Sequence, residues 1–229
     1  MKKPLIEIEV VSDVVCPWCY IGKRRMEKAV AQLSNEFEFR ISYSPFELNP
    51  HIPEKGLDQK AYLTDKFGGE VQYQQITSRV SQTAAEEGLK FDFSKQHVSP
   101  NTRHAHRIIR FAKQKGKQEA VKEAFMKAYF EDGVDLSSHD NLATVAEAAG
   151  LNRKEVLELL NSDTGLAEIK QLEQINIQRG ISGVPFFIIN NKYGFSGAQP
   201  TAVFQKAFQQ VATELTTTAE QCEVDTKDC

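Results

Sequence analysis

Apolar residues near the N-terminus of the chain follow two different spacings. Within Ile6–Val10 they alternate with glutamates, and a second alternation runs through Phe37–Tyr43. Successive side chains of a strand point to opposite faces, so both alternations predict strands with one buried face. Between them, the apolar residues of Cys19–Leu33 recur at helical spacing. The first 45 residues therefore predict a β-α-β unit whose connection is long enough for a parallel crossover.

The middle of the chain has a different pattern. The stretch "SPFELNPHIPEKG" carries three prolines and a glycine and predicts a loop. Residues from about 57 to 160 predict successive helices separated by glycine and proline, and Ser138 and Asn152 are expected to cap two of them. Another helix is expected over 164–179. Leu89–Phe93 offers a brief strand-like alternation.

Strand character returns in the C-terminal part. A hydrophobic run, Phe186–Ile189, is followed by the turn residues Asn190-Asn191, a second short strand and a helix that Pro200 opens. The two outer pieces are expected to share one sheet, with the helical block as an insertion. The chain thus predicts an α/β fold with a split sheet domain (residues 1–50 and 163–216), a helical insertion (51–162) and a polar tail (217–229).

Composition and charge exclude several kinds of partner. The chain has 229 residues and a net charge of −3, so nothing favours binding to nucleic acid or to an anionic membrane surface. Its apolar runs are all shorter than a membrane span. Glu7 and Glu9 interrupt the N-terminal apolar run, which therefore predicts a strand better than a secretion signal. We expect a cytoplasmic protein, where thiols are kept reduced.

Two cysteines mark the junction between the first strand and the first helix, in "SDVVCPWCYIGKRRM". The unpaired N–H groups and positive dipole at a helix N-terminus favour thiolate over thiol. Pro17 suits the first helical turn because its missing N–H would be unpaired there. We expect Cys16, at the mouth of the turn, to attack a disulfide, and Cys19, deeper on the apolar face, to resolve the mixed disulfide.

Other interpretations of these cysteines are weaker. A zinc site needs two more ligands, and the remaining cysteines lie some two hundred residues away. His104 and His106 are two apart on a predicted helix and point to different faces, so no metal site is expected. Inert core cysteines do not explain a strand that runs directly into C-P-W-C. Asp13 is equally compatible with tuning the thiols, transferring protons or capping the turn.

The chain resembles a known family in two places. "SDVVCPWCYIGKRR" together with "GVPFFIINNKYGFSGAQ" is similar to the DsbA-like branch of the thioredoxin superfamily, particularly its FrnE-type members, over nearly the whole chain. The resemblance implies a thioredoxin fold that carries a helical domain, and thiol–disulfide oxidoreductase chemistry. It also implies that Pro185, preceded by Val184, is cis and lies beside the sulfurs. From the sequence alone, Pro185 only starts a strand, which is compatible with a trans bond.

The resemblance further implies partners and a substrate site. The expected substrates are protein or peptide disulfides, bound at Pro17, Trp18, Val184 and Pro185; Trp18 is alternatively an apolar cover for the turn. No cofactor is expected beyond the redox-active disulfide, with a thiol reductant such as glutathione as electron donor. Periplasmic DsbA enzymes carry a histidine between their cysteines. Its absence here predicts a less oxidising disulfide, which suits a cytoplasmic reductase or isomerase.

Two other functions stay open at this stage. The related branch of 2-hydroxychromene-2-carboxylate isomerases and kappa-class glutathione transferases binds glutathione and usually has serine where Cys16 stands. A non-catalytic module that binds client proteins is the other alternative. Cys222 and Cys229, in the polar stretch "QCEVDTKDC", form either a second redox pair, a staple of the tail or two idle thiols.

Overall fold

The computed structural model describes residues 3–225, with side chains up to residue 214. Its N-terminal part is the predicted β-α-β unit: β1 (Leu5–Ser12), α1 (Pro17–Leu33) and β2 (Glu38–Pro45). β1 and β2 pair in parallel, with Leu5 opposite Glu38. The parallel pairing confirms the predicted crossover.

The helical segment follows β2 and contains two very short strands. Its elements are β3 (Leu57–Asp58), α2 (Gln59–Phe67), α3 (Glu70–Glu86), β4 (Val98–Ser99), α4 (Arg103–Gln114), α5 (Gln118–Phe130), α6 (His139–Ala148), α7 (Arg153–Leu160) and α8 (Leu166–Gln178). The two predicted caps are confirmed. Ser138 accepts a hydrogen bond from the Asn141 N–H, and Asn152 accepts one from the Glu155 N–H.

The C-terminal part completes the sheet. β5 (Phe186–Ile189) and β6 (Tyr193–Ser196) form a hairpin, and α9 (Thr201–Asp225) follows. The strand order is β2-β1-β5-β6, and β5 runs antiparallel to β1. The outer pieces of the chain therefore share one sheet, as predicted. The predicted turn residues Asn190 and Asn191 both have positive φ, 50° and 52°, between β5 and β6.

The strand-like alternation at Leu89–Phe93 does not form a strand, so this prediction is wrong. This segment has no strand pairing, and its aromatic residues pack among other rings instead: Phe91 stacks on Phe130, with ring centroids 4.5 Å apart. In the described part of this region, pairing occurs between β3 and β4. Two residues per strand are too few for a periodic pattern to reveal them.

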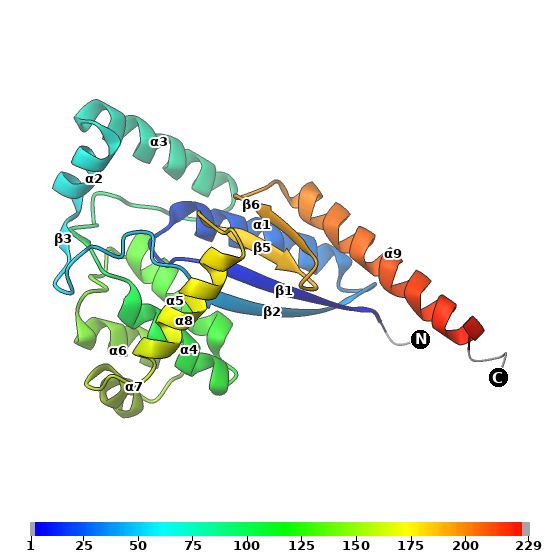
Figure 1. Cartoon of the computed structure of the whole chain (residues 1–229). Helices are drawn as coiled ribbons and strands as arrows, with labels where there is room; N and C mark the ends of the chain where they lie inside the picture. The colour runs from blue at the N-terminus through cyan, green and yellow to red at the C-terminus, as the bar shows by residue number, and fades with distance from the viewer. Residues whose placement is uncertain (1–2, 226–229) are drawn as a thin grey trace.

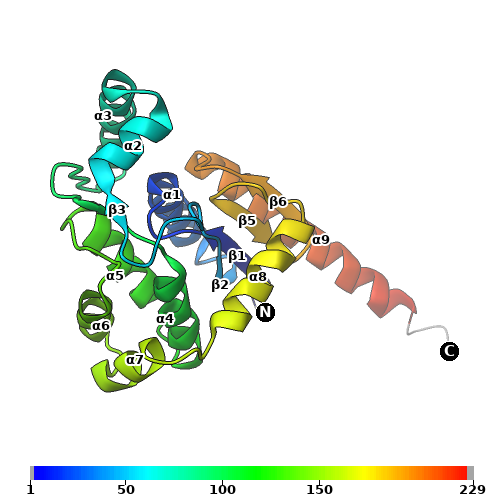
Figure 2. The same ribbon diagram turned by 60° about the vertical axis from the view of Figure 1, so that its left-hand side comes forward.

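The helical segment surrounds the end of the sheet where β1 leads into α1. In Figure 1, α2 and α3 stand apart from the group α4–α7, while the sheet and α9 extend away from both. Figure 2 shows the same division from a second direction. α3 contacts α1, and α5 and α8 both contact β2. One arm of the inserted segment thus packs on α1 and the other on β2. No described helix is long and apolar enough to cross a membrane.

Candidate active site

Cys16 is the last residue before α1. Its backbone is extended (φ −91°, ψ 112°), and its carbonyl accepts hydrogen bonds from the N–H groups of Cys19 and Tyr20, at 3.0 and 3.4 Å. No side chain caps the helix, and Pro17 occupies its first turn. The thiol of Cys16 therefore stands where the first-turn N–H groups are unpaired and the helix dipole is positive.

The two cysteines are close together but differently placed. Both are free, and both are almost fully buried, with 3% of Cys16 and 1% of Cys19 exposed. They share one turn at the start of α1, where the Cys19 N–H donates to the Cys16 carbonyl. Cys16 lines a cavity, whereas Cys19 belongs to the core. The residue expected to attack is thus the one that faces open space, although it is less exposed than a thiol at the mouth of a turn suggests.

The loop before β5 closes over Cys16. The Val184–Pro185 peptide bond is cis, as the resemblance implies. The Cys16 thiol donates to the Val184 carbonyl, with sulfur and oxygen 3.6 Å apart. Gly22 allows this approach, because a Cβ at that position would lie 3.2 Å from both Pro185 Cγ and Phe187 Cζ. A glycine on the buried face of a predicted helix is the sequence signal for such close packing.

A buried carboxylate lies beneath the cysteines. Asp13 is fully buried; its Oδ2 accepts from the Leu48 N–H at 2.8 Å, and its Oδ1 lies 3.3 Å from Nε2 of His106. Burial alone opposes ionisation. The hydrogen bond and charge of His106, the Leu48 N–H and the charge of Lys122 outweigh burial and lower the pKa of Asp13. Asp13 is therefore an anion held by two helices of the insertion.

Lys122 of α5 is a buried cation at the same place. Its Nζ donates to the Ser12 carbonyl at 3.4 Å, and only 1% of the residue is exposed. Burial lowers the pKa of Lys122 to about 8, although Cys19, Asp13 and Cys16 all act to raise it. One long hydrogen bond is weak compensation for desolvating an ammonium group, which has three donors.

Cys19 has the opposite shift. Burial, then the hydrogen bond and charge of Cys16, raise the pKa of Cys19 well above its usual value, while Lys122 acts to lower it. This arrangement makes Lys122 the buried positive charge that favours a thiolate at Cys19.

Sequence reasoning missed the roles of His106 and Lys122. The sequence favours a surface histidine or a hydrogen-bonded buried one at His106 over a metal ligand, but it does not place that histidine beside Asp13. A signal existed for Lys122. It lies three, four and seven residues before Phe125, Met126 and Tyr129, which are buried, so it interrupts an apolar helix face.

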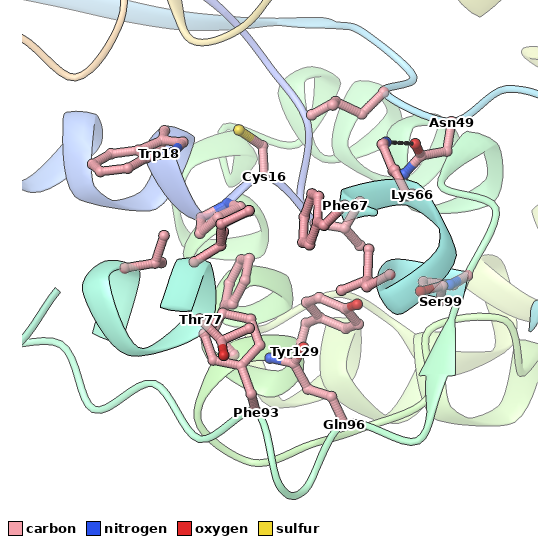
Figure 3. A pocket seen from close by; sticks show the side chains of 18 of the residues that line it. Cys16, Trp18, Asn49, Lys66, Phe67, Thr77, Phe93, Gln96, Ser99 and Tyr129 are labelled. Carbon is pink, nitrogen blue, oxygen red and sulfur yellow. Dashed lines mark hydrogen bonds between the residues drawn. The ribbon is translucent and has the colours of Figure 1, made fainter. Parts of the chain in front are cut away.

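The cavity beside Cys16 has a volume of about 280 Å³. Figure 3 shows Cys16 and Trp18 on one side, Asn49 and Lys66 on another, and Phe93, Gln96 and Tyr129 deeper in. Three of the four residues predicted to bind substrate line it together with Cys16: Pro17, Trp18 and Val184. Pro185 is not in the lining but follows Val184 directly. The Cys222 side chain and all of Cys229 lie outside the described part, so the second pair stays a prediction.

A thioredoxin-type sheet, a C-P-W-C pair at a helix N-terminus and a cis proline beside it define a class of proteins. The DsbA-like thioredoxin domain matches residues 7–209, and the chain belongs to this family. The family and fold expected from the resemblance are therefore confirmed, and the family is one of thiol–disulfide oxidoreductases.

Individual proteins are similar over most of the chain. An uncharacterized protein of Bacillus subtilis, YwbO, is 30% identical over 88% of this chain and 95% of its own. The crystal structure of a probable DsbA oxidoreductase of Streptomyces coelicolor, SCO1869, is 33% identical, with a TM-score of 0.84, covering 90% of this chain and 89% of its own. A 2-hydroxychromene-2-carboxylate isomerase shares the fold at 15% identity, with a TM-score of 0.68, covering 92% of this chain and 98% of its own.

Proposed function

We propose that this protein is a dithiol–disulfide oxidoreductase that reduces or isomerises disulfides of proteins or peptides in the cytoplasm. One observation carries the proposal: the Cys16 thiol stands at the uncapped N-terminus of α1, three residues before Cys19, and donates a hydrogen bond to the Val184 carbonyl. A nucleophilic thiol, a resolving thiol and a backbone acceptor thus meet beside a cavity. The similarity to a probable DsbA oxidoreductase supports the same chemistry.

The reaction is two successive exchanges. The Cys16 thiolate attacks one sulfur of the substrate disulfide, a Cys16–substrate disulfide forms, and the other substrate sulfur leaves with the electron pair and takes a proton. Cys19 then loses its proton and attacks Cys16, which releases the second substrate thiol and leaves a Cys16–Cys19 disulfide. A thiol reductant returns two electrons to this disulfide. Lys122 supplies the positive charge at Cys19 during the second exchange.

We assign the binding of the protein or peptide substrate to the surface around Cys16. Trp18 is about one-third exposed, whereas Cys19 and the next residues of α1 are buried. Backbone groups beside Pro185 can pair with an extended substrate segment, as in strand addition.

Reduction of insulin disulfides by a thiol reductant tests the proposal. Wild type should accelerate reduction, Cys16→Ser should lose the acceleration, and Cys19→Ser should accumulate a mixed disulfide between Cys16 and substrate, detectable by mass spectrometry. The double variant Cys222→Ser/Cys229→Ser is compared in the same assay, and lost turnover there assigns the tail pair a redox role. Turnover that survives in Cys16→Ser would refute the proposal.

A further inference from the structure

The cavity beside Cys16 is enclosed by the helical insertion. Its walls come from the N-terminal turn of α1, from α2 and α3, and from α5. Most of the lining is apolar, contributed by Leu63, Phe67, Ile76, Val80, Phe93 and Phe130. Its volume of about 280 Å³ lies just below the range for small-molecule sites, which begins near about 300 Å³.

A cation stands on one side of this apolar space. Lys66, in the last turn of α2, lines the cavity, and its ammonium group donates a hydrogen bond to Oδ1 of Asn49, a neutral partner. The ammonium also lies 5.7 Å from the centre of the Tyr62 ring. In the described part of the chain no carboxylate comes within ion-pair distance of Lys66. Its charge is therefore available to an anionic group of a ligand that enters beside Cys16.

A hydrogen-bond donor without a partner stands deeper in the cavity. Gln96 is 5% exposed and lines the cavity, and its Nε2 has no hydrogen-bond partner among the described residues. A short chain of bonds fixes the orientation of this amide: Tyr73 donates to Gln59 Oε1, and Gln59 Nε2 donates to Gln96 Oε1. A buried donor that is left unpaired costs free energy, and an acceptor on a ligand would remove that cost.

We propose that this cavity binds a low-molecular-weight thiol or disulfide whose sulfur lies at Cys16. A carboxylate of this ligand pairs with Lys66. Its aromatic or branched apolar group extends to Gln96 and carries a hydrogen-bond acceptor for the amide there. The proposal rests on the proposed function and adds a second substrate class to the protein or peptide disulfides. A peptide backbone fits this space poorly, because its N–H and C=O groups would lack partners among the apolar walls. The bonds exchanged are those of the two steps above: Cys16 captures one half of the small disulfide and Cys19 releases it as a thiol.

Binding can be measured without any sulfur chemistry. Trp18 is the one tryptophan of the sequence and lines the cavity, so its fluorescence reports occupancy. We expect saturable binding of 3-phenylpropionate, and binding of 3-(4-hydroxyphenyl)propionate that is about 3- to 10-fold tighter, the ratio for one added hydrogen bond. Gln96→Met should abolish this ratio while leaving 3-phenylpropionate binding intact. Gln75→Met, at an exposed position of α3, is the matched control and should preserve the ratio.

Two further variants test the walls and the cation. Val80→Phe fills the cavity and should weaken both probes at least about 10-fold, whereas Val71→Phe, at an exposed position of the same helix, should weaken neither. Lys66→Met should weaken both probes to a similar degree, since both carry the carboxylate. The binding result for Val80→Phe is used only if this variant unfolds in a cooperative thermal transition. If it does not, Gln96→Met, which conserves volume, still tests the proposal.

Turnover measured with two substrates distinguishes a failure of the proposed function from a failure of the proposed substrate class. With 5,5′-dithiobis(2-nitrobenzoate), a carboxylate-bearing aryl disulfide, Val80→Phe should lower kcat/KM at least about 10-fold more than it does with insulin. Absence of saturable probe binding, or an equal loss with both substrates, would overturn the substrate class even if Cys16→Ser is inactive. Saturable binding together with full turnover in Cys16→Ser would overturn the proposed function and leave the cavity as a binding site.

Discussion

Replacement of the buried Lys122 by methionine should stabilise the protein and slow its second exchange step. At pH 7 this lysine is charged in both the folded and the unfolded state. Its pKa falls from 10.5 in the unfolded chain to about 8 in the folded one, a difference of about 2.5 units. At about 1.4 kcal/mol per unit, holding the charge in the folded state costs about 3.5 kcal/mol.

The expected gain is smaller than this cost. The lowered pKa already includes the attraction to Asp13, but methionine also gives up the hydrogen bond to the Ser12 carbonyl, so we expect a net stabilisation of about 1–3 kcal/mol. For a chain of this length each kcal/mol raises Tm by about 2–4 °C. Lys127→Met, at an exposed position of the same helix, is the control and should change stability by less than about 0.5 kcal/mol.

The pH dependence of stability identifies the titrating group. Between about pH 8 and pH 10.5 the unfolded lysine still holds its proton while the folded one has lost it, so Lys122 makes wild type more stable as pH rises through that window. Cys19 acts in the opposite direction above pH 9, because its folded pKa is raised. The difference between Lys122→Met and wild type isolates the lysine, and the advantage of the variant should shrink across this window.

The functional consequence separates an electrostatic role from simple packing. Lys122 acts to lower the pKa of Cys19, so its loss should make Cys19 a rarer thiolate and prolong the lifetime of the Cys16–substrate disulfide. Quenched-flow alkylation measures that lifetime. A destabilised Lys122→Met, or one whose mixed disulfide is resolved at the wild-type rate at pH 7, would refute this account of the buried lysine.

Two other substitutions test the surroundings of the cysteines. Asp13→Asn should destabilise the protein at pH 7, since the anion is paired with His106. Because the pKa of Asp13 is lowered from 3.8, the difference in stability measured by urea unfolding should shrink as the pH falls below 3.8. A difference that stays constant with pH would contradict the pairing. Gly22→Val should cost about 1–3 kcal/mol, because its side chain would meet Pro185 and Phe187, and unchanged urea unfolding would show that α1 has room to move.

Local pattern was sufficient for the elements that carry the dithiol. The alternation in β1, the helical spacing of α1 and the run Phe186–Ile189 each depend on a buried face that repeats over several residues, and all three elements are present. The strand expected at Leu89–Phe93 failed because alternating aromatics also suit packing against other rings, such as that of Phe130.

The rest of the site depends on contacts that no local pattern contains. Asp13 is held by Leu48 and His106, which lie 35 and 93 positions further along the chain, and Lys122 comes from yet another helix. The cavity likewise combines α1 with distant helices of the insertion and with the segment before β4 that carries Gln96, whose Nε2 is unpaired. Tertiary packing decides which helix of an insertion reaches the sheet. A single sequence therefore does not identify His106 and Lys122 as partners of Asp13 and the cysteines.

The central claim is that Cys16 and Cys19 act as one reversible redox pair. The most direct measurement is a titration of the full chain in glutathione buffers of increasing oxidation, followed by alkylation and mass spectrometry of the peptide that contains both cysteines. The account predicts one two-electron transition in which that peptide loses two hydrogens and both sulfurs become resistant to alkylation together. A glutathione adduct on Cys16 that persists while Cys19 remains alkylatable, or two reduced thiols at every ratio, would contradict it.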